Sequence, residues 1–219
     1  MYKALVLLLR VLIGWKVKVK VEGQDNLPTN GPVLVIFNHN DFLDTIAILF
    51  SLPRKLTAFV ASNYRNNPVV LLFRMVGSVI LVNRGRTDKS AMKQGLKLLN
   101  NGGFLAVAPE GTRGQTAGLG TGKYGAAYLA GTIGCLIVPV GIEGTTAGFK
   151  RVLGGLLTRD KIVVNVRVGL PFYLTVPEEL KNSNLAEPGV KDSWQLITNV
   201  QMMPAIARLL PEDLRGNFS

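Results

Sequence analysis

Short, unbroken apolar runs alternate with longer amphipathic stretches along this chain, and this alternation strongly limits the folds that it can adopt. Three such runs are Val33–Phe37, Phe104–Ala108 and Leu136–Ile142. A strand that is apolar at every position needs cover on both faces, as in a parallel sheet flanked by helices. We therefore predict an α/β domain with a largely parallel sheet covered by helices, in which ligands bind beyond the ends of the strands.

The remaining elements follow from side-chain periodicity and from turn residues. Four further strands are predicted, at Lys16–Val21, Leu56–Ala61, Ser78–Val82 and Lys161–Val168. Five helices are predicted, at Asp41–Leu52, Pro68–Met75, Thr87–Leu99, Lys123–Thr132 and Val190–Leu209, the last bent by Pro204. The glycine-rich stretch from Gly111 to Gly122 is predicted to be a loop.

No linker, repeat or low-complexity tract divides the 219 residues, so residues 16–219 are predicted to form one domain. The first 15 residues are rich in Leu, Val and Ile, but their apolar runs are far shorter than the roughly 20 residues of a spanning helix. The basic cluster Lys16, Lys18 and Lys20 adjoins them, which favours a helix that lies in the membrane interface. The alternative is an ordinary first helix packed on the core.

The formal net charge of +11 predicts anionic partners. Positive mean hydropathy (+0.27) and a low aromatic content favour a membrane surface with anionic lipids over nucleic acid. Cys135 lies in an apolar run and is predicted to be a buried thiol. With one histidine and one cysteine in the chain, no zinc site built on clusters of these residues is possible, and no metal is expected.

The only histidine lies in the segment Asn38–Asp44, where the strand Val33–Phe37 gives way to a helix. An imidazole can take up a proton near neutral pH, and does so better when a carboxylate fixes its tautomer. On a regular helix, side chains five residues apart do not face each other. The pairing of His39 with Asp44 therefore requires the histidine in the turn before the helix and Asp44 in its first turn. Asp41 is the natural N-cap and the rival partner of His39.

Two further segments offer groups for an anion. Arg84 and Arg86 follow the strand Ser78–Val82, and the alternative for them is a solvated loop. The segment Pro109-Glu-Gly-Thr-Arg113 offers a backbone glycine, a hydroxyl and a guanidinium, which suit a phosphate group. Glu110 would repel a phosphate, so we expect it to hold an arginine or to accept a hydrogen bond from a substrate hydroxyl.

These residues resemble the motifs of the glycerolipid acyltransferase superfamily, whose best-known members are the lysophosphatidic acid acyltransferases. The blocks appear in the family's order between residues 33 and 142: Asn38-His39…Asp44, Gly77…Arg84, Pro109-Glu-Gly-Thr-Arg113 and Val138-Pro-Val-Gly-Ile142. Asp41 stands where members often carry a serine. Residues 150–219 match no motif of the family.

The resemblance implies that His39 is the catalytic base and Asp44 its support. The acceptor hydroxyl would attack the thioester of acyl-CoA or acyl carrier protein, without a cofactor and without an acyl-enzyme. It also implies that Arg84, Gly111, Thr112 and Arg113 hold the phosphate of a lysophospholipid acceptor, with Glu110 at the substrate and Lys123 as a further anion-binding residue.

The resemblance also implies phospholipid biosynthesis by a protein that associates with the cytoplasmic face of a membrane, peripherally or monotopically. Two alternatives stay open. The acceptor could be glycerol phosphate, another lysophospholipid or an acylated amino acid. The chain could instead be a non-catalytic basic protein that binds membranes or nucleic acid.

Overall fold

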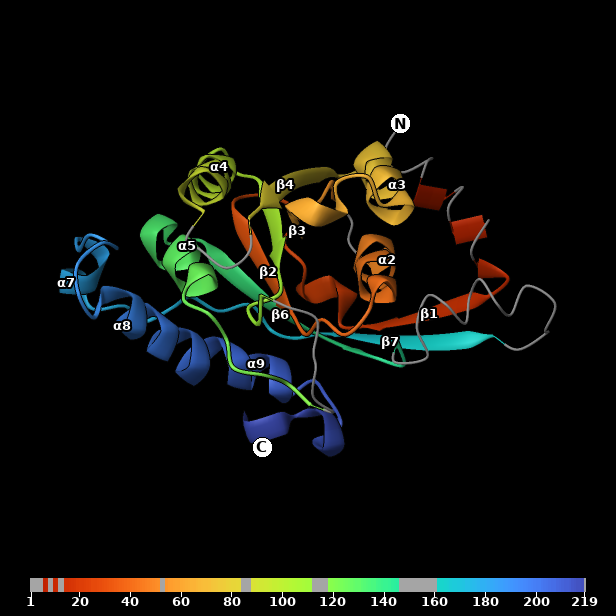
Figure 1. Ribbon diagram of the computed structural model, residues 1–219. Helices are drawn as coiled ribbons and strands as arrows, with labels where there is room; N and C mark the ends of the chain where they lie inside the picture. Colours follow the sequence, from red (N-terminus) through yellow and green to blue (C-terminus); the bar gives the residue numbers. More distant parts are fainter. Residues whose placement is uncertain are drawn as a thin grey trace.

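A seven-stranded sheet forms the centre of the described part of the chain (Figure 1). The computed structural model describes residues 6–7, 10–11, 14–51, 54–83, 88–111, 118–145 and 161–218. The strands follow the order β1-β7-β6-β2-β5-β3-β4 across the sheet. Their bounds are β1 Val17–Glu22, β2 Val33–Phe37, β3 Thr57–Ala61, β4 Ser78–Val82, β5 Phe104–Val107, β6 Leu136–Glu143 and β7 Ile162–Val168.

Helices connect most of these strands, as the alternating pattern predicts. They are α2 Phe42–Ser51, α3 Pro68–Val76, α4 Lys89–Asn100, α5 Gly125–Ile133, α7 Glu178–Lys181, α8 Val190–Ile197 and α9 Met203–Ala207. Helix α4 begins after Asp88, whose carboxylate accepts a hydrogen bond from the Ala91 N–H at 3.0 Å. The α/β prediction is confirmed.

The sheet is largely parallel, but β1 and β7, which lie side by side at one edge, run against the other strands. Strands β6, β2, β5, β3 and β4 pair in parallel. Strand β7 is antiparallel to β6, and β1 pairs in parallel with β7. This pair therefore extends the parallel core along one edge in the opposite direction, which the sequence pattern did not predict.

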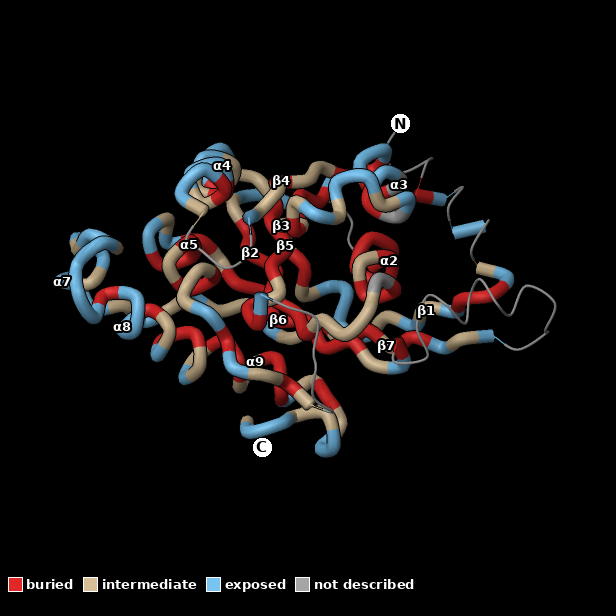
Figure 2. Tube along the Cα trace, in the orientation of Figure 1, coloured by how far each residue is buried: buried red, intermediate tan, exposed pale blue. Residues whose placement is uncertain are grey.

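Each face of the sheet is covered by its own set of helices (Figures 1 and 2). In β2, Val33, Val35 and Phe37 pack with α2 and α3, whereas Leu34 and Ile36 pack with α4, α5, α8 and α9. All five residues of β2 are buried. The strand is apolar at every position because helices cover both faces of the sheet, as predicted.

The connections of two neighbouring strands cross opposite faces of the sheet. The helix α2 that follows β2 packs on one face, and the helix α5 that follows β5 packs on the other. Because β2 and β5 are adjacent, the loops after them diverge at their carboxyl ends. Such a switch point is where open α/β sheets bind ligands.

The predicted interfacial helix at residues 1–15 lies largely outside the described residues. Its described residues 6–7, 10–11 and 14 are helical. Val6 is buried, whereas the side chains of Leu7 and Val11, one helical turn apart, are 61% and 69% exposed. Among the described residues, the helices are too short or too polar to cross a membrane.

The C-terminal helical segment is interrupted as its proline predicts. A π-helical turn at Thr198–Met202 separates α8 from α9, whose second residue is Pro204. Proline cannot donate to the carbonyl four residues before it, and wider π turns occur where a helix is disturbed in this way.

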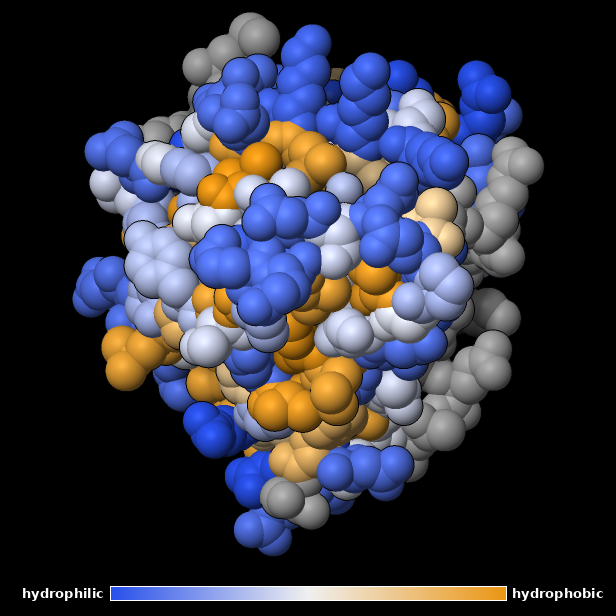
Figure 3. Space-filling view, turned by 90° about the vertical axis from the view of Figure 1, so that its left-hand side faces the viewer, coloured by the Kyte–Doolittle hydropathy of each residue, from blue (hydrophilic) through white to orange (hydrophobic). Residues whose placement is uncertain are grey.

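Figure 3 views the side of the molecule on which α7 and α8 lie, where hydrophilic side chains surround several apolar patches.

The contact between α5 and α8 depends on a residue without a side chain. Trp194 is fully buried, and a Cβ atom on Gly131 would lie 2.5 Å from the indole Cζ3. We expect Gly131→Ala to lower the free energy of unfolding by about 1–3 kcal/mol, because overpacking outweighs the roughly 1 kcal/mol gain in helix propensity. Urea denaturation measures this change.

Gly125→Ala, in the first turn of the same helix, is the matched control. A Cβ atom there would meet only Met92 atoms at ordinary contact distances of 3.8 and 3.9 Å. This variant should be as stable as the parent or more stable. If Gly131→Ala left the free energy of unfolding equally unchanged, Gly131 would not be in close contact with Trp194.

Candidate active site

The turn after β2 is held in place by the residue that precedes the histidine. Asn38 is buried, and its carboxamide donates to the Ile142 carbonyl and accepts from the Ile142 N–H, both at 2.8 Å. This side chain continues the pairing between β2 and β6 by one residue beyond the strand. His39 therefore begins a turn whose backbone is fixed to the neighbouring strand.

His39 and Asp44 meet as the sequence spacing requires. The Nδ1 atom of His39 lies 3.0 Å from Oδ2 of Asp44, whose side chain is fully buried. His39 lies in the turn between β2 and α2, and Asp44 lies in the first turn of α2. The predicted contact and its predicted geometry are both confirmed.

The same Asp44 oxygen also satisfies backbone N–H groups at the start of α2. It accepts hydrogen bonds from the N–H groups of Asn40 (2.6 Å) and Asp41 (2.8 Å). In return, Oδ1 of Asp41 accepts from the Leu43 N–H at 3.1 Å. The two aspartates thus cap the start of α2 reciprocally. Asp41 is the N-cap, as predicted, and the carboxylate that contacts His39 belongs to Asp44.

The contact with Asp44 determines which nitrogen of the His39 ring can accept a proton. A carboxylate accepts hydrogen bonds, so the neutral imidazole carries its proton on Nδ1 and keeps a lone pair on Nε2. No described residue forms a hydrogen bond with Nε2. The ring packs edge-to-face against Phe37 at 5.8 Å, and its side chain is 18% exposed. The geometry provides an oriented base that a small ligand can reach.

Glu110 connects the ends of β2 and β5. One carboxylate oxygen accepts from the Gly120 N–H at 2.9 Å, and the other from the His39 N–H at a longer 3.4 Å. Burial raises the pKa of the Glu110 carboxyl, and these two hydrogen bonds oppose the rise. We expected Glu110 to contact an arginine or a substrate hydroxyl. Among the described residues it contacts the backbone of the turn that carries His39 and of the glycine-rich segment. The expected partners Arg84 and Arg113 lie outside the described residues, so that expectation stays a prediction.

Lys123 lies against Gly111. The glycine has a positive φ of 68°, and a Cβ atom there would lie 2.9 Å from Cδ and 3.2 Å from Nζ of Lys123. The Lys123 N–H also donates to the Pro109 carbonyl at 2.8 Å. The structure thus brings together two of the predicted anion-binding residues. Arg84, Thr112 and Arg113 lie outside the described residues.

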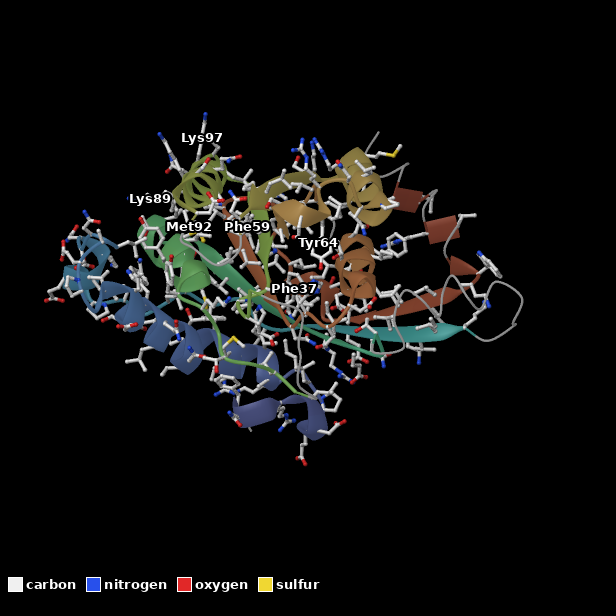
Figure 4. The ribbon with its side chains drawn as sticks, viewed as in Figure 1. Phe37, Phe59, Tyr64, Lys89, Met92 and Lys97 are labelled. Atoms are coloured by element: carbon white, nitrogen blue, oxygen red, sulfur yellow. The ribbon has the colours of Figure 1, made fainter. Side chains whose placement is uncertain are left out.

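A cavity of about 540 Å³ joins these groups. His39, Gly111 and Lys123 line it, while much of its wall is apolar and comes from both helical layers, with Ile48, Phe73 and Met92 among the lining residues. Figure 4 shows four lining residues, Phe37, Phe59, Tyr64 and Met92, and the outward-facing lysines of α4, Lys89 and Lys97.

The cavity lies where the sheet opens. Strand β3 pairs with β5 at only two positions, ending at Ala58 and Ala106, although β3 itself continues to Ala61. Beyond this point the cavity is lined by Phe59–Ala61 of β3, by Val107 at the end of β5 and by the two residues that follow it. An apolar space therefore passes between the two strands, close to the histidine.

The single cysteine of the chain does not line this cavity. Cys135 is a buried thiol, as predicted, and burial raises its pKa to about 11, so it stays protonated near neutral pH. Within the described residues, no three His, Cys, Asp or Glu side chains are grouped as metal ligands would be.

The part of the chain that builds most of this site matches a known protein family. A family model described as Acyltransferase matches residues 18–143. The chain is similar to the chloroplastic 1-acyl-sn-glycerol-3-phosphate acyltransferase LPAT1 of Arabidopsis thaliana, with 32% identity over 131 residues, which are 58% of this chain and 36% of that protein. It is also similar to the 1-acyl-sn-glycerol-3-phosphate acyltransferase of Bacillus subtilis (strain 168), with 26% identity over 68% of this chain and 74% of that protein.

The fold also matches a solved structure. The crystal structure of the 1-acyl-sn-glycerophosphate (LPA) acyltransferase PlsC from Thermotoga maritima aligns with a TM-score of 0.65 and 20% identity, over 100% of this chain and 81% of that one. Several relatives are longer than the region they share with this chain. Matches cover between 36% and 54% of the length of the chloroplastic and Chlamydomonas reinhardtii proteins and of the Borreliella burgdorferi protein.

The single histidine makes its tautomer directly measurable. In ¹⁵N NMR of the neutral ring, we expect the proton on Nδ1, because Asp44 accepts from that atom. Asp44→Ala should shift the proton toward Nε2. Asp88→Ala, which removes the capping carboxylate of α4, should leave the ring unchanged. A proton on Nε2 in the unmodified protein would contradict the assignment.

Proposed function

The chain belongs to the acyltransferase family, and we propose that it transfers a fatty acyl group from a thioester donor to the free hydroxyl of a lysophosphatidic acid-type acceptor. The product would be phosphatidic acid, an intermediate in phospholipid biosynthesis. One observation carries the proposal: His39, with Nδ1 bound to the buried Asp44 and Nε2 available, lies in the wall of a largely apolar cavity. The names of the relatives support the choice of acceptor.

In this proposal His39 is the general base. Its Nε2 takes the proton of the acceptor hydroxyl as the oxygen attacks the thioester carbonyl. The tetrahedral intermediate then expels the thiolate, which receives the proton from the imidazolium. Asp44 stabilises the imidazolium and keeps the ring in the required tautomer, as the carboxylate of a serine hydrolase triad does.

The transfer needs no covalent acyl-enzyme. Cys135, the only cysteine, is buried and protonated, and it does not line the cavity. The chain also has no G-x-S-x-G nucleophile elbow. Direct attack by the acceptor hydroxyl is therefore the reaction for which this chain supplies a residue.

The apolar part of the cavity suits a hydrocarbon chain. Ile48, Leu56 and Phe73 line it from one helical layer, and Ala91, Met92 and Ala126 from the other. Removing an acyl chain from water is favourable by roughly 0.8 kcal/mol for each buried CH₂ group. We propose that the acyl chain occupies this space, with its carbonyl carbon near His39.

The polar end of the cavity would bind the acceptor phosphate. Lys123 supplies an ammonium group there, and Gly111 lets the backbone come close to a ligand. We propose that Arg84, Thr112 and Arg113 complete this anion site, as the family motifs imply. Glu110 would act beside them by holding the His39 turn and the segment at Gly120 in register.

The proposed location is a membrane surface. The side chains of Leu7, Val11 and Trp15 are 61%, 69% and 48% exposed, and Lys18 and Lys20 follow along the chain. Exposed apolar side chains next to basic ones are typical of helices that lie in the interface of anionic membranes. We propose peripheral attachment at the cytoplasmic face, where acyl-CoA and acyl carrier protein are the candidate donors.

His39→Ala should lower turnover at least 10²-fold, since a general base typically contributes about 10²–10⁴-fold. The assay is thioester release from acyl-CoA and from acyl carrier protein, with lysophosphatidic acid, glycerol phosphate, other lysophospholipids and an acylated amino acid as acceptors. Lys97→Ala, at an exposed position on α4, is the control that should keep full activity. Near-normal turnover of a folded His39→Ala protein would remove His39 from the mechanism.

Arg113→Ala should raise the KM for lysophosphatidic acid by on the order of 10–100-fold, because a charge-assisted hydrogen bond contributes about 1.5–3 kcal/mol. The KM for the acyl donor should change little. Arg208→Ala, which removes an exposed arginine that does not line the cavity, should change neither constant. An unchanged acceptor KM in Arg113→Ala would exclude this residue from the phosphate site.

A further inference from the structure

The segment that carries Lys123 is held by a part of the chain outside the family match. The family model ends at residue 143, and residues 150–219 showed no recognisable motif. However, the Leu119 N–H donates to the Leu214 carbonyl at 2.9 Å, and the π turn between α8 and α9 packs directly on Gly122. The C-terminal region therefore contacts the segment that carries Lys123, next to the cavity.

Asn199, in the π turn, binds both backbone groups of Gly122. Its Oδ1 accepts from the Gly122 N–H at 2.8 Å, and its Nδ2 donates to the Gly122 carbonyl at 2.9 Å. The same Nδ2 donates to the Gln195 carbonyl at 2.7 Å, which fixes the carboxamide to its own helix. A Cβ atom at Gly122 would lie 2.6 Å from Cγ2 of Thr198, so the segment approaches as closely as only a glycine allows.

The next residue is Lys123, and its backbone is fixed from two sides. Its N–H donates to Pro109 at 2.8 Å, and its carbonyl accepts from the Thr198 hydroxyl at 3.2 Å. With the backbone held in this way, the side chain runs across Gly111 toward the cavity. The backbone from which the Lys123 side chain extends is thus fixed by Pro109 on one side and by the π turn on the other.

We propose that Asn199 is a positioning residue that, through Gly122, holds Lys123 where its ammonium group meets the acceptor phosphate. This inference rests on the proposed function. Asn199 does not line the cavity and touches no reacting atom. Its effect should therefore be on binding of the phosphate-bearing acceptor rather than on the chemical step.

The π turn supplies a matched control two residues further on. Gln201 makes the same kind of double contact with Thr175: Oε1 accepts from the N–H at 2.9 Å, and Nε2 donates to the carbonyl at 2.8 Å. Neither Gln201 nor Thr175 lines the cavity. Gln201→Ala therefore removes two side chain–backbone hydrogen bonds of the same pattern, in a more exposed position, from the same turn without touching the Lys123 segment.

The experiment compares Asn199→Ala with Gln201→Ala. We expect Asn199→Ala to raise the KM for lysophosphatidic acid on the order of 10-fold, with a much smaller change in kcat and in the donor KM. Gln201→Ala should leave all three constants unchanged. Thermal unfolding of both variants shows whether either has lost stability. Equal acceptor KM values in the two variants would overturn the proposal.

A double-mutant cycle with Lys123→Ala tests whether the effect passes through the lysine. If it does, Asn199→Ala adds little to the acceptor KM once Lys123 is absent, whereas fully additive effects would overturn the proposal. Calorimetric binding of lysophosphatidic acid gives the same comparison without turnover. If the unmodified protein neither binds nor acylates this acceptor, the proposed function fails, and the inference fails with it. If the unmodified protein is active and Asn199→Ala keeps its KM, only the inference fails.

Discussion

The buried carboxylate of Asp44 accepts three hydrogen bonds on one oxygen, from the His39 ring and from the N–H groups of Asn40 and Asp41. Two of these bonds satisfy backbone groups at the start of α2, where an N-cap contact typically contributes about 1 kcal/mol. The third orients the imidazole. One oxygen therefore holds both the start of the helix and the imidazole ring.

The rest of the site is built around this turn through backbone contacts. Asn38 fixes it to β6, and Glu110 connects it to β5 and to Gly120. Burial raises the pKa of the Glu110 carboxyl, and the hydrogen bonds from the two N–H groups offset part of the cost of burying its charged form. Buried polar side chains therefore connect the ends of three neighbouring strands, in addition to the strand pairing and apolar packing within the sheet.

Local features of the site could be predicted from the sequence, and distant ones could not. The five-residue spacing between His39 and Asp44 restricts their geometry so far that the turn and the contact could both be predicted. The apolar run at Val33–Phe37 likewise predicted a strand covered on both faces. The reversed pair of β1 and β7 was missed, because strand periodicity does not encode direction. Asn199 was missed as well, since an asparagine carries no signal for a glycine 77 residues away.

That separation has a consequence for how the protein is made. Chains leave the ribosome at roughly 5–20 residues per second, so the glycine-rich segment emerges about 4–15 s before the residue that binds it. During this interval the histidine, its aspartate and the strands around them are already available to fold. Gly122 and the lysine beside it still lack their partner. The newly made chain can thus form its histidine–aspartate pair first, whereas the segment of Gly122 and Lys123 gains its remaining contacts only when the π turn arrives.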